Sequence, residues 1–165
     1  MKKYLLLSIL ACLSLSIFAQ NTPENSWKDL SFLDGQSQIN FTVDFSRAII
    51  LDMDVEEFIA QEPDWDEGLA EMRAKFIQAF NEKSPVKAVT GEDTDYMLVI
   101  LPLKVTEKGS HVQGFFRIAD KSGKEVFTHR FDNEAGIFGS ALNLMGDAFE
   151  DLGEELGKAF KKNVD

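Results

Sequence analysis

Strict alternation of apolar and polar residues begins at Ile39. Phe41, Val43 and Phe45 alternate with polar residues up to Ser46. A period of two is typical of a strand that buries one face. The apolar run 48–51 either extends this strand or forms a second short one. The pattern therefore predicts a half-buried strand at the start of the folded region.

A helix is predicted after this strand. Pro63 stands near its start, followed by acidic residues that favour the positive end of the helix dipole. One face then carries apolar residues at helical spacing: Trp65, Leu69, Met72, Phe76, Ala79 and Phe80. We interpret this stripe as a core-facing surface rather than a ligand groove. Ser84 and Pro85 end the helix, because proline cannot continue it.

Three further strands are expected to form an antiparallel meander. The apolar run 96–101 predicts a central strand covered on both faces, and Pro102 indicates a bulge or an edge position. Strands over 112–119 and 125–131 follow. The turn at 120–123 ends in a glycine, which adopts the positive φ that hairpin loops require.

The last predicted helix has the most regular pattern. Ser140 is its expected N-cap, and the apolar residues that follow are Leu142, Met145, Phe149, Leu152, Leu156 and Ala159. Acidic residues come early and lysines last, which complements the helix dipole.

Two glycines lie beside this apolar stripe. Gly146 and Gly153 each cost a helix up to about 1 kcal/mol relative to alanine, so they indicate close approach of another element. We favour packing against the domain's own sheet over contact with a partner helix. Both glycines are kept as candidate partner-binding residues.

The order strand, helix, meander, helix predicts an α+β fold. The expected architecture is a two-layer sandwich, with both helices packed on one face of a mostly antiparallel sheet. The alternative is a split, mixed sheet with helices on opposite faces. Residues 39–165 form the predicted single domain, and residues 20–38 an irregular leader held by Trp27 and Phe32.

Residues 1–19 have the three parts of a secretory signal peptide. A short basic start precedes an apolar run, and Ala19 offers a small residue for cleavage. Cys12 loosely matches the lipobox of bacterial lipoproteins, but the residues after it stay apolar, so we favour ordinary cleavage after Ala19. The sequence thus predicts an exported protein, periplasmic or outer-membrane-associated, with membrane association only if Cys12 is lipidated.

The composition narrows the possible partners. Removing the signal peptide takes away two lysines and changes the net charge from −11 to −13. Such a surface repels nucleic acid and anionic lipid. The remaining chain has no cysteine, so disulfide and thiol chemistry are excluded. About 146 residues are enough for one domain with a hydrophobic core.

No catalytic or cofactor motif is present in the sequence. His111 and His129 do not have the spacing of metal ligands, and we interpret both as structural or surface residues. The chain has no GxSxG elbow, no phosphate-binding loop and no dinucleotide fingerprint. We therefore expect no cofactor and no enzymatic activity.

An acidic stretch supplies the weak metal candidates. Asp52, Asp54 and Glu56 present alternate oxygen donors that Ca²⁺ prefers, but the glycine and terminal glutamate of an EF-hand loop are missing. We favour a solvated connection into a helix. A calcium-dependent binding module and a hydrolase with an unrecognised carboxylate pair stay as alternatives.

Two segments, one near each end of the chain, resemble those of known exported proteins. The segment Ile17-Phe18-Ala19-Gln20 and the glycine-rich tail over 136–158 resemble uncharacterised small exported envelope proteins of the Bacteroides group. At the level of fold, the order of elements is distantly similar to the amino-terminal domain of TolB and to the curli-secretion lipoprotein type. The resemblance implies an envelope assembly or interaction module. We therefore predict a non-enzymatic protein that binds another protein or a surface component.

Overall fold

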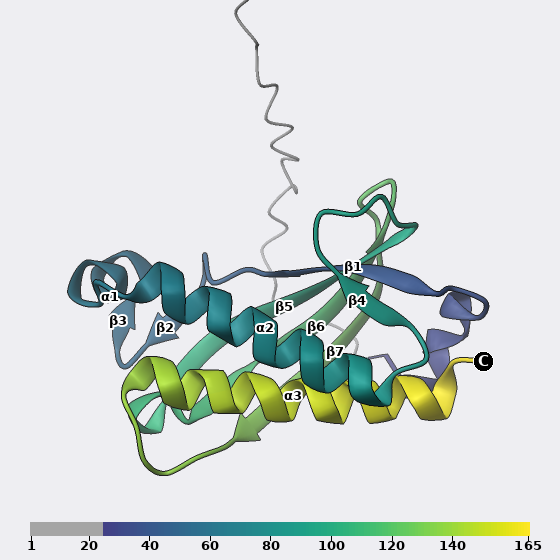
Figure 1. Cartoon of the computed structure of the whole chain (residues 1–165). Helices are drawn as coiled ribbons and strands as arrows, with labels where there is room; N and C mark the ends of the chain where they lie inside the picture. The colour runs from purple at the N-terminus through teal and green to yellow at the C-terminus, as the bar shows by residue number, and fades with distance from the viewer. Residues whose placement is uncertain (1–24) are drawn as a thin grey trace, which may run out of the picture.

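In the computed structural model, which describes residues 25–165, seven strands form one mixed sheet (Figure 1). The strands are β1 (Gln38–Val43), β2 (Ile49–Ile50), β3 (Met53–Asp54), β4 (Lys87–Val89), β5 (Tyr96–Thr106), β6 (His111–Asp120) and β7 (Glu125–Glu134). The helices are α1 (Val55–Gln61), α2 (Trp65–Lys83) and α3 (Ala141–Asn163), with 3₁₀ helices η1 (Trp27–Leu33) and η2 (Glu107–Gly109). The predicted signal peptide and Cys12 lie outside the described residues.

Strand β5 is the centre of the sheet. One of its edges pairs in parallel with β1 and then β2, and its other edge pairs antiparallel with β6, which pairs with β7. The predicted meander is therefore confirmed. The expectation of a mostly antiparallel sheet is wrong for β1, β2 and β4, because the helical crossover after β1 returns the chain in the same direction.

Helices α2 and α3 lie side by side on one face of the sheet (Figure 1), which confirms the predicted two-layer α+β architecture. The ring of Phe41 on β1 stacks on that of Phe76 on α2, with centroids 4.5 Å apart. Phe45 and Phe149 make the corresponding contact to α3 at 5.9 Å. The expected cover on both faces of β5 is wrong at Met97, which is 41% exposed on the other face, whereas Leu101 farther along that face is buried.

The strand β5 is irregular at its proline, as predicted. The pairing with β6 shifts register between Pro102 and Lys104, because proline offers no N–H to the ladder. Gly114 lies opposite the irregularity, where a Cβ would stand 2.2 Å from the carbonyl oxygen of Leu101. The two strands approach each other there more closely than side chains allow.

The leader is partly helical and belongs to the core, so the prediction of an irregular segment is wrong over η1. Ser26 and Asp29 form a capping box at its start. Leu30 and Leu33 on its inner side are completely buried. Two leucines three residues apart are too short a pattern to reveal a helix in the sequence.

The apolar pattern of the sequence predicted the long helices correctly, but it did not predict several short elements. Ser140 accepts a hydrogen bond from the backbone N–H of Asn143 and caps α3 as predicted. The pattern missed α1, β3 and β4, which have seven residues or fewer. Among residues 25–165, no helix combines the length and the apolar composition that crossing a membrane requires.

Candidate functional site

A groove of about 420 Å³ lies on the helix-free face of the sheet. Its floor contains Met97 and Val99 of β5 and Ala119 of β6. Strand alternation turns these residues away from the helices, because their neighbour Leu98 is completely buried on the opposite face. Met97 and Ala119 are directly paired across the two strands. The floor is therefore apolar and open to solvent.

One rim of the groove is the loop 92–95 before β5. The backbone N–H of Asn40 donates to Thr94 Oγ1 at 3.0 Å, and the Asn40 side-chain amide donates to the carbonyl oxygen of Glu92 at 3.0 Å. Thr94 in turn donates to the carbonyl oxygen of Tyr96 at 2.7 Å. These bonds tie the loop to β1 and β5, so its acidic side chains are held at the edge of the floor.

The hairpin 120–123 between β6 and β7 is the other rim. Asp120 Oδ1 accepts hydrogen bonds from the Ser122 N–H at 2.8 Å and from the Lys124 N–H at 3.1 Å. The Ser122 hydroxyl also donates to it, and this bond is the main cause that lowers the pKa of Asp120 below its usual value. Gly123 closes the turn with a φ of +80°. The predicted hairpin is confirmed.

A lysine joins the two rims. Lys121 Nζ lies 3.0 Å from a carboxylate oxygen of Asp95 and 3.6 Å from one of Asp93. The hydrogen bond to Asp95 is the main cause that raises the pKa of Lys121. The residues that line the groove thus include one lysine and four carboxylates: Glu92, Asp93, Asp95 and Asp120. The rim is acidic, so it disfavours an acidic ligand.

We expect Ser122→Ala to raise the titration midpoint of Asp120. Because the folded-state pKa lies below the unfolded value, this carboxylate stabilises the hairpin above the unfolded pKa, and the contribution is lost as pH falls through the folded pKa. Carboxyl carbon NMR of the two proteins measures the midpoint. Ser46→Ala, remote from the hairpin, serves as the control, and an unchanged Asp120 midpoint in Ser122→Ala would contradict the assignment.

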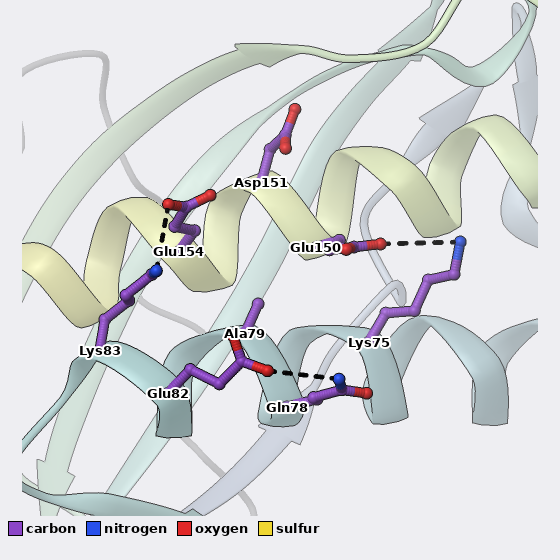
Figure 2. Close-up of a pocket in the computed structure, with 8 residues that line it drawn as sticks. All are labelled: Lys75, Gln78, Ala79, Glu82, Lys83, Glu150, Asp151 and Glu154. Carbon is purple, nitrogen blue, oxygen red and sulfur yellow. Dashed lines mark hydrogen bonds and ion pairs between the residues drawn. The ribbon is translucent and has the colours of Figure 1, made fainter.

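A second groove, of about 250 Å³, runs between α2 and α3 (Figure 2). Lys75 Nζ lies 2.7 Å from Asp147 and 3.9 Å from Glu150 across the two helices. The hydrogen bond to Asp147 is the main cause that raises the pKa of Lys75. Lys83 lies 3.6 Å from Glu154 in the same way. These ion pairs link the helices to each other.

The carboxylates of this groove do not form an acid and base pair for hydrolysis. Glu150 and Glu154 are held by lysines, and Glu82 accepts a hydrogen bond from Gln78. Burial, followed by the nearby Glu154, raises the pKa of Asp151, but this side chain points away from α2 (Figure 2). A glycoside hydrolase needs two carboxyl groups facing a shared space. We therefore interpret the groove as a structural contact.

The candidate glycines Gly146 and Gly153 lie in the interface between α2 and α3. A Cβ at Gly153 would stand 2.5 Å from the carbonyl oxygen of Phe76, and one at Gly146 would stand 3.5 Å from Lys75 Cδ. Both glycines are buried. The neighbour that approaches them is α2 rather than the expected sheet, so no open surface for a partner exists at these positions.

The calcium candidates do not converge. Asp52 lies between β2 and β3 with a φ of +68°, and Asp54 caps α1 by accepting a hydrogen bond from the Glu57 N–H at 2.8 Å. Glu56 lies exposed in the first turn of that helix. Within residues 25–165, no three His, Cys, Asp or Glu side chains are placed to hold a metal ion. The geometry gives the calcium alternative no support.

Both histidines have partners within the fold. His111 Nε2 lies 2.5 Å from Asp132, and this hydrogen bond is the main cause that lowers the pKa of Asp132. The ring of His129 packs on Trp27, with centroids 3.9 Å apart, and its Nδ1 lies 3.0 Å from the carbonyl oxygen of Asn25. Neither histidine lines either groove.

Comparison with known proteins gives no match to a protein family, a curated protein or a solved structure. The geometry of the described residues therefore carries the functional argument. It selects the groove on the sheet, which sequence reasoning missed because three separate segments build it. The one visible signal was the repeated acidic turn, at 92–95 and again at 120–123, beside the two strands of the meander.

Proposed function

We propose that this protein is a non-enzymatic binding module of the cell envelope, whose groove on the sheet holds an apolar segment of a partner protein. The carrying observation is the position of Met97. Its side chain is 41% exposed, and it lines the groove rather than a convex surface. A concave apolar floor with a few polar groups at its edge is typical of a binding site.

The acidic rim determines which segments fit. Removing an acidic side chain from water beside four carboxylates is unfavourable, whereas a neutral or basic flank is tolerated or attracted. The floor supplies no charged partner, so it favours a large apolar side chain. The expected ligand is therefore one apolar anchor residue between neutral or basic neighbours.

The place of action remains a prediction from the sequence. The signal peptide over 1–19 and the resemblance to exported envelope proteins of the Bacteroides group favour a periplasmic or outer-membrane-associated location. Without the predicted signal peptide the net charge changes from −11 to −13, which disfavours nucleic acid and anionic lipid as partners. An uncharged or basic protein segment with an apolar side chain matches both the apolar floor and the acidic rim.

A peptide titration tests the proposal. The probe is a capped pentapeptide with a central phenylalanine, flanking glycines and terminal lysines; its counterpart carries terminal glutamates. We expect the lysine peptide to shift the amide NMR signals of Met97, Ala119 and Gly123, and the glutamate peptide to bind at least about tenfold more weakly.

The matched variants are Met97→Asp, which alters the floor, and Ile59→Asp, which alters an exposed apolar residue on α1. We expect Met97→Asp to abolish the shifts and Ile59→Asp to leave them unchanged. Shifts that spread over other surfaces, or that are equal for the two peptides, would contradict the proposed groove.

A further inference from the structure

The four methionines among residues 25–165 differ in their access to solvent. Met72 on α2 and Met145 on α3 are completely buried in the hydrophobic core. Met97 on β5 is 41% exposed and lines the groove on the helix-free face of the sheet. A reagent dissolved in water can therefore reach Met97 in the folded protein, whereas it reaches the two buried methionines only after the core opens.

Met53 on β3 is the closest comparison for Met97, because it is half-buried and does not line the groove. The side-chain amide of Gln61 donates a hydrogen bond to Met53 Sδ at 3.1 Å. This bond occupies a lone pair of the sulfur, which is the group that an oxidant attacks. Met53 should therefore react with an oxidant more slowly than Met97.

The thioether of methionine is the oxidisable sulfur of this region. The one cysteine of the sequence is Cys12, so residues 25–165 contain no thiol to compete for an oxidant. A peroxide transfers one oxygen atom: the sulfur lone pair attacks that oxygen, the S–O bond forms as the O–O bond breaks, and the proton passes to the leaving oxygen. The sulfur loses two electrons, and the peroxide is reduced to water or an alcohol. The product is methionine sulfoxide.

A sulfoxide at Met97 would change the floor of the groove. Its oxygen is a hydrogen-bond acceptor, and the floor side chains of Val99 and Ala119 have no donor. In the free protein, water can satisfy this oxygen because the residue is exposed. An apolar anchor residue that covers the floor would remove that water and leave the acceptor unpaired, which is unfavourable. Oxidation should thus weaken binding without unfolding the domain.

Several donors of the rim are already used within the rim itself. The hydroxyl of Thr94 donates to the first carbonyl oxygen of β5, and the hydroxyl of Ser122 donates to Asp120. Lys121 Nζ lies 3.0 Å from a carboxylate oxygen of Asp95. The ionised carboxylates of the rim can only accept hydrogen bonds. The rim therefore does not favour a sulfoxide oxygen beside it.

We infer that Met97 is an oxidation site at which a peroxide switches the groove off, by converting the apolar thioether of the floor into a sulfoxide. The loss of binding rests on the proposed function, because it concerns the same groove, whereas the selective oxidation does not. The change can be reversed. A methionine sulfoxide reductase, with a dithiol as electron donor, removes the oxygen as water and leaves a disulfide.

Peptide mass spectrometry after timed exposure to hydrogen peroxide tests the site. The protein purified after expression of the full chain is digested, and fragment spectra assign each added oxygen to one methionine. We expect Met97 to react at least about tenfold faster than Met72 and Met145, and faster than Met53, because access of the oxidant decides the rate in the folded protein. In urea the four rates should converge. A folded protein in which Met53 reacts first, or in which Met97 is as protected as the buried pair, would overturn the inference.

Binding of the lysine pentapeptide, followed by the amide NMR signals of the groove, tests the consequence. Oxidation of Met97 should weaken binding at least about tenfold, since the bound state buries an unpaired acceptor, and reductase with dithiothreitol should restore it. Met53→Leu should lose affinity on peroxide treatment in the same way. Met97→Leu has no sulfur in the floor, so its affinity, whatever its value before treatment, should be the same afterwards.

The two proposals fail in different ways. An unoxidised protein that does not bind the peptide overturns the proposed function, while the mass spectra still decide the oxidation site. Equal binding before and after complete oxidation of Met97 overturns the inference alone, as does a loss of affinity in Met97→Leu as large as in the unmodified protein. Thermal melting followed by circular dichroism checks that the oxidised protein is folded. A large fall in its melting temperature would assign the lost binding to unfolding and overturn the switch.

Discussion

Replacing Leu30 with alanine is expected to lower the free energy of unfolding by about 3 kcal/mol. Leu30 is completely buried within η1, and the leader contributes it to the same core as the helices and the sheet. Removing the methine carbon and the two methyl carbons there loses their transfer free energy and leaves a cavity. Urea denaturation followed by circular dichroism measures the change.

The neighbouring positions provide controls. Phe32 is only partly buried and contacts Tyr96 with ring centroids 5.1 Å apart, so Phe32→Ala should cost less than Leu30→Ala despite the larger side chain. Lys28 is exposed, and Lys28→Ala should stay within about 0.5 kcal/mol of the unmodified protein. If Leu30→Ala were equally neutral, the leader would not belong to the cooperative unit.

Gly153→Ala is expected to destabilise the protein by about 2 kcal/mol, whereas Gly146→Ala should be neutral or stabilise it by up to about 1 kcal/mol. Alanine is the better helix former at both positions. At Gly153 the new Cβ would stand 2.5 Å from the backbone oxygen of Phe76, so α2 and α3 must move apart. At Gly146 the nearest atom, Lys75 Cδ, is 3.5 Å away and belongs to a flexible side chain.

Urea denaturation of the two variants separates helix propensity from packing. Gly157→Ala extends the series, because its Cβ would stand 2.8 Å from the carbonyl oxygen of Phe80 and should also destabilise. Stabilisation by Gly153→Ala equal to that by Gly146→Ala would contradict the close approach of the helices. None of the three substitutions lies in the groove on the sheet. Each variant that folds should therefore still bind the lysine peptide.

The two faces of the sheet have different roles, and the substitutions above affect only the face that the helices cover. One face is covered by α2, α3 and η1, and its charged residues serve mainly to join the helices (Figure 2). The other face carries the groove and has no helix over it (Figure 1). The functional proposals therefore concern the face that folding leaves open.

Local periodicity was sufficient to predict the long elements. Helices α2 and α3 repeat their apolar residues at helical spacing, β5 begins with a continuous apolar run, and polar turns bound β6 and β7. Such a repeat states which face of an element is buried, and it follows from backbone geometry alone. The residues at the element ends agree as well, since Ser140 accepts the N-cap hydrogen bond that was expected, and Gly123 has the positive φ expected in the hairpin loop 120–123.

Periodicity does not state which element covers a buried face. The glycines of α3 indicated a close neighbour, and only the tertiary structure identified it as α2. Leu30 and Leu33 become core residues because η1 packs against distant strands, as the contact of Trp27 with Phe127 at 5.7 Å shows. The local pattern does not identify the partner element in either contact.

The sequence by itself determined the α+β class, the meander and the two long helices, because each depends on short-range repeats and turn chemistry. Tertiary structure alone decided the mixed sheet, the burial of the leader and the groove. The groove needs Asn40, the loop 92–95 and the hairpin 120–123 at one end of the sheet. Pairing of strands distant in sequence brings them together, and strand register is set by the whole fold rather than by any one segment.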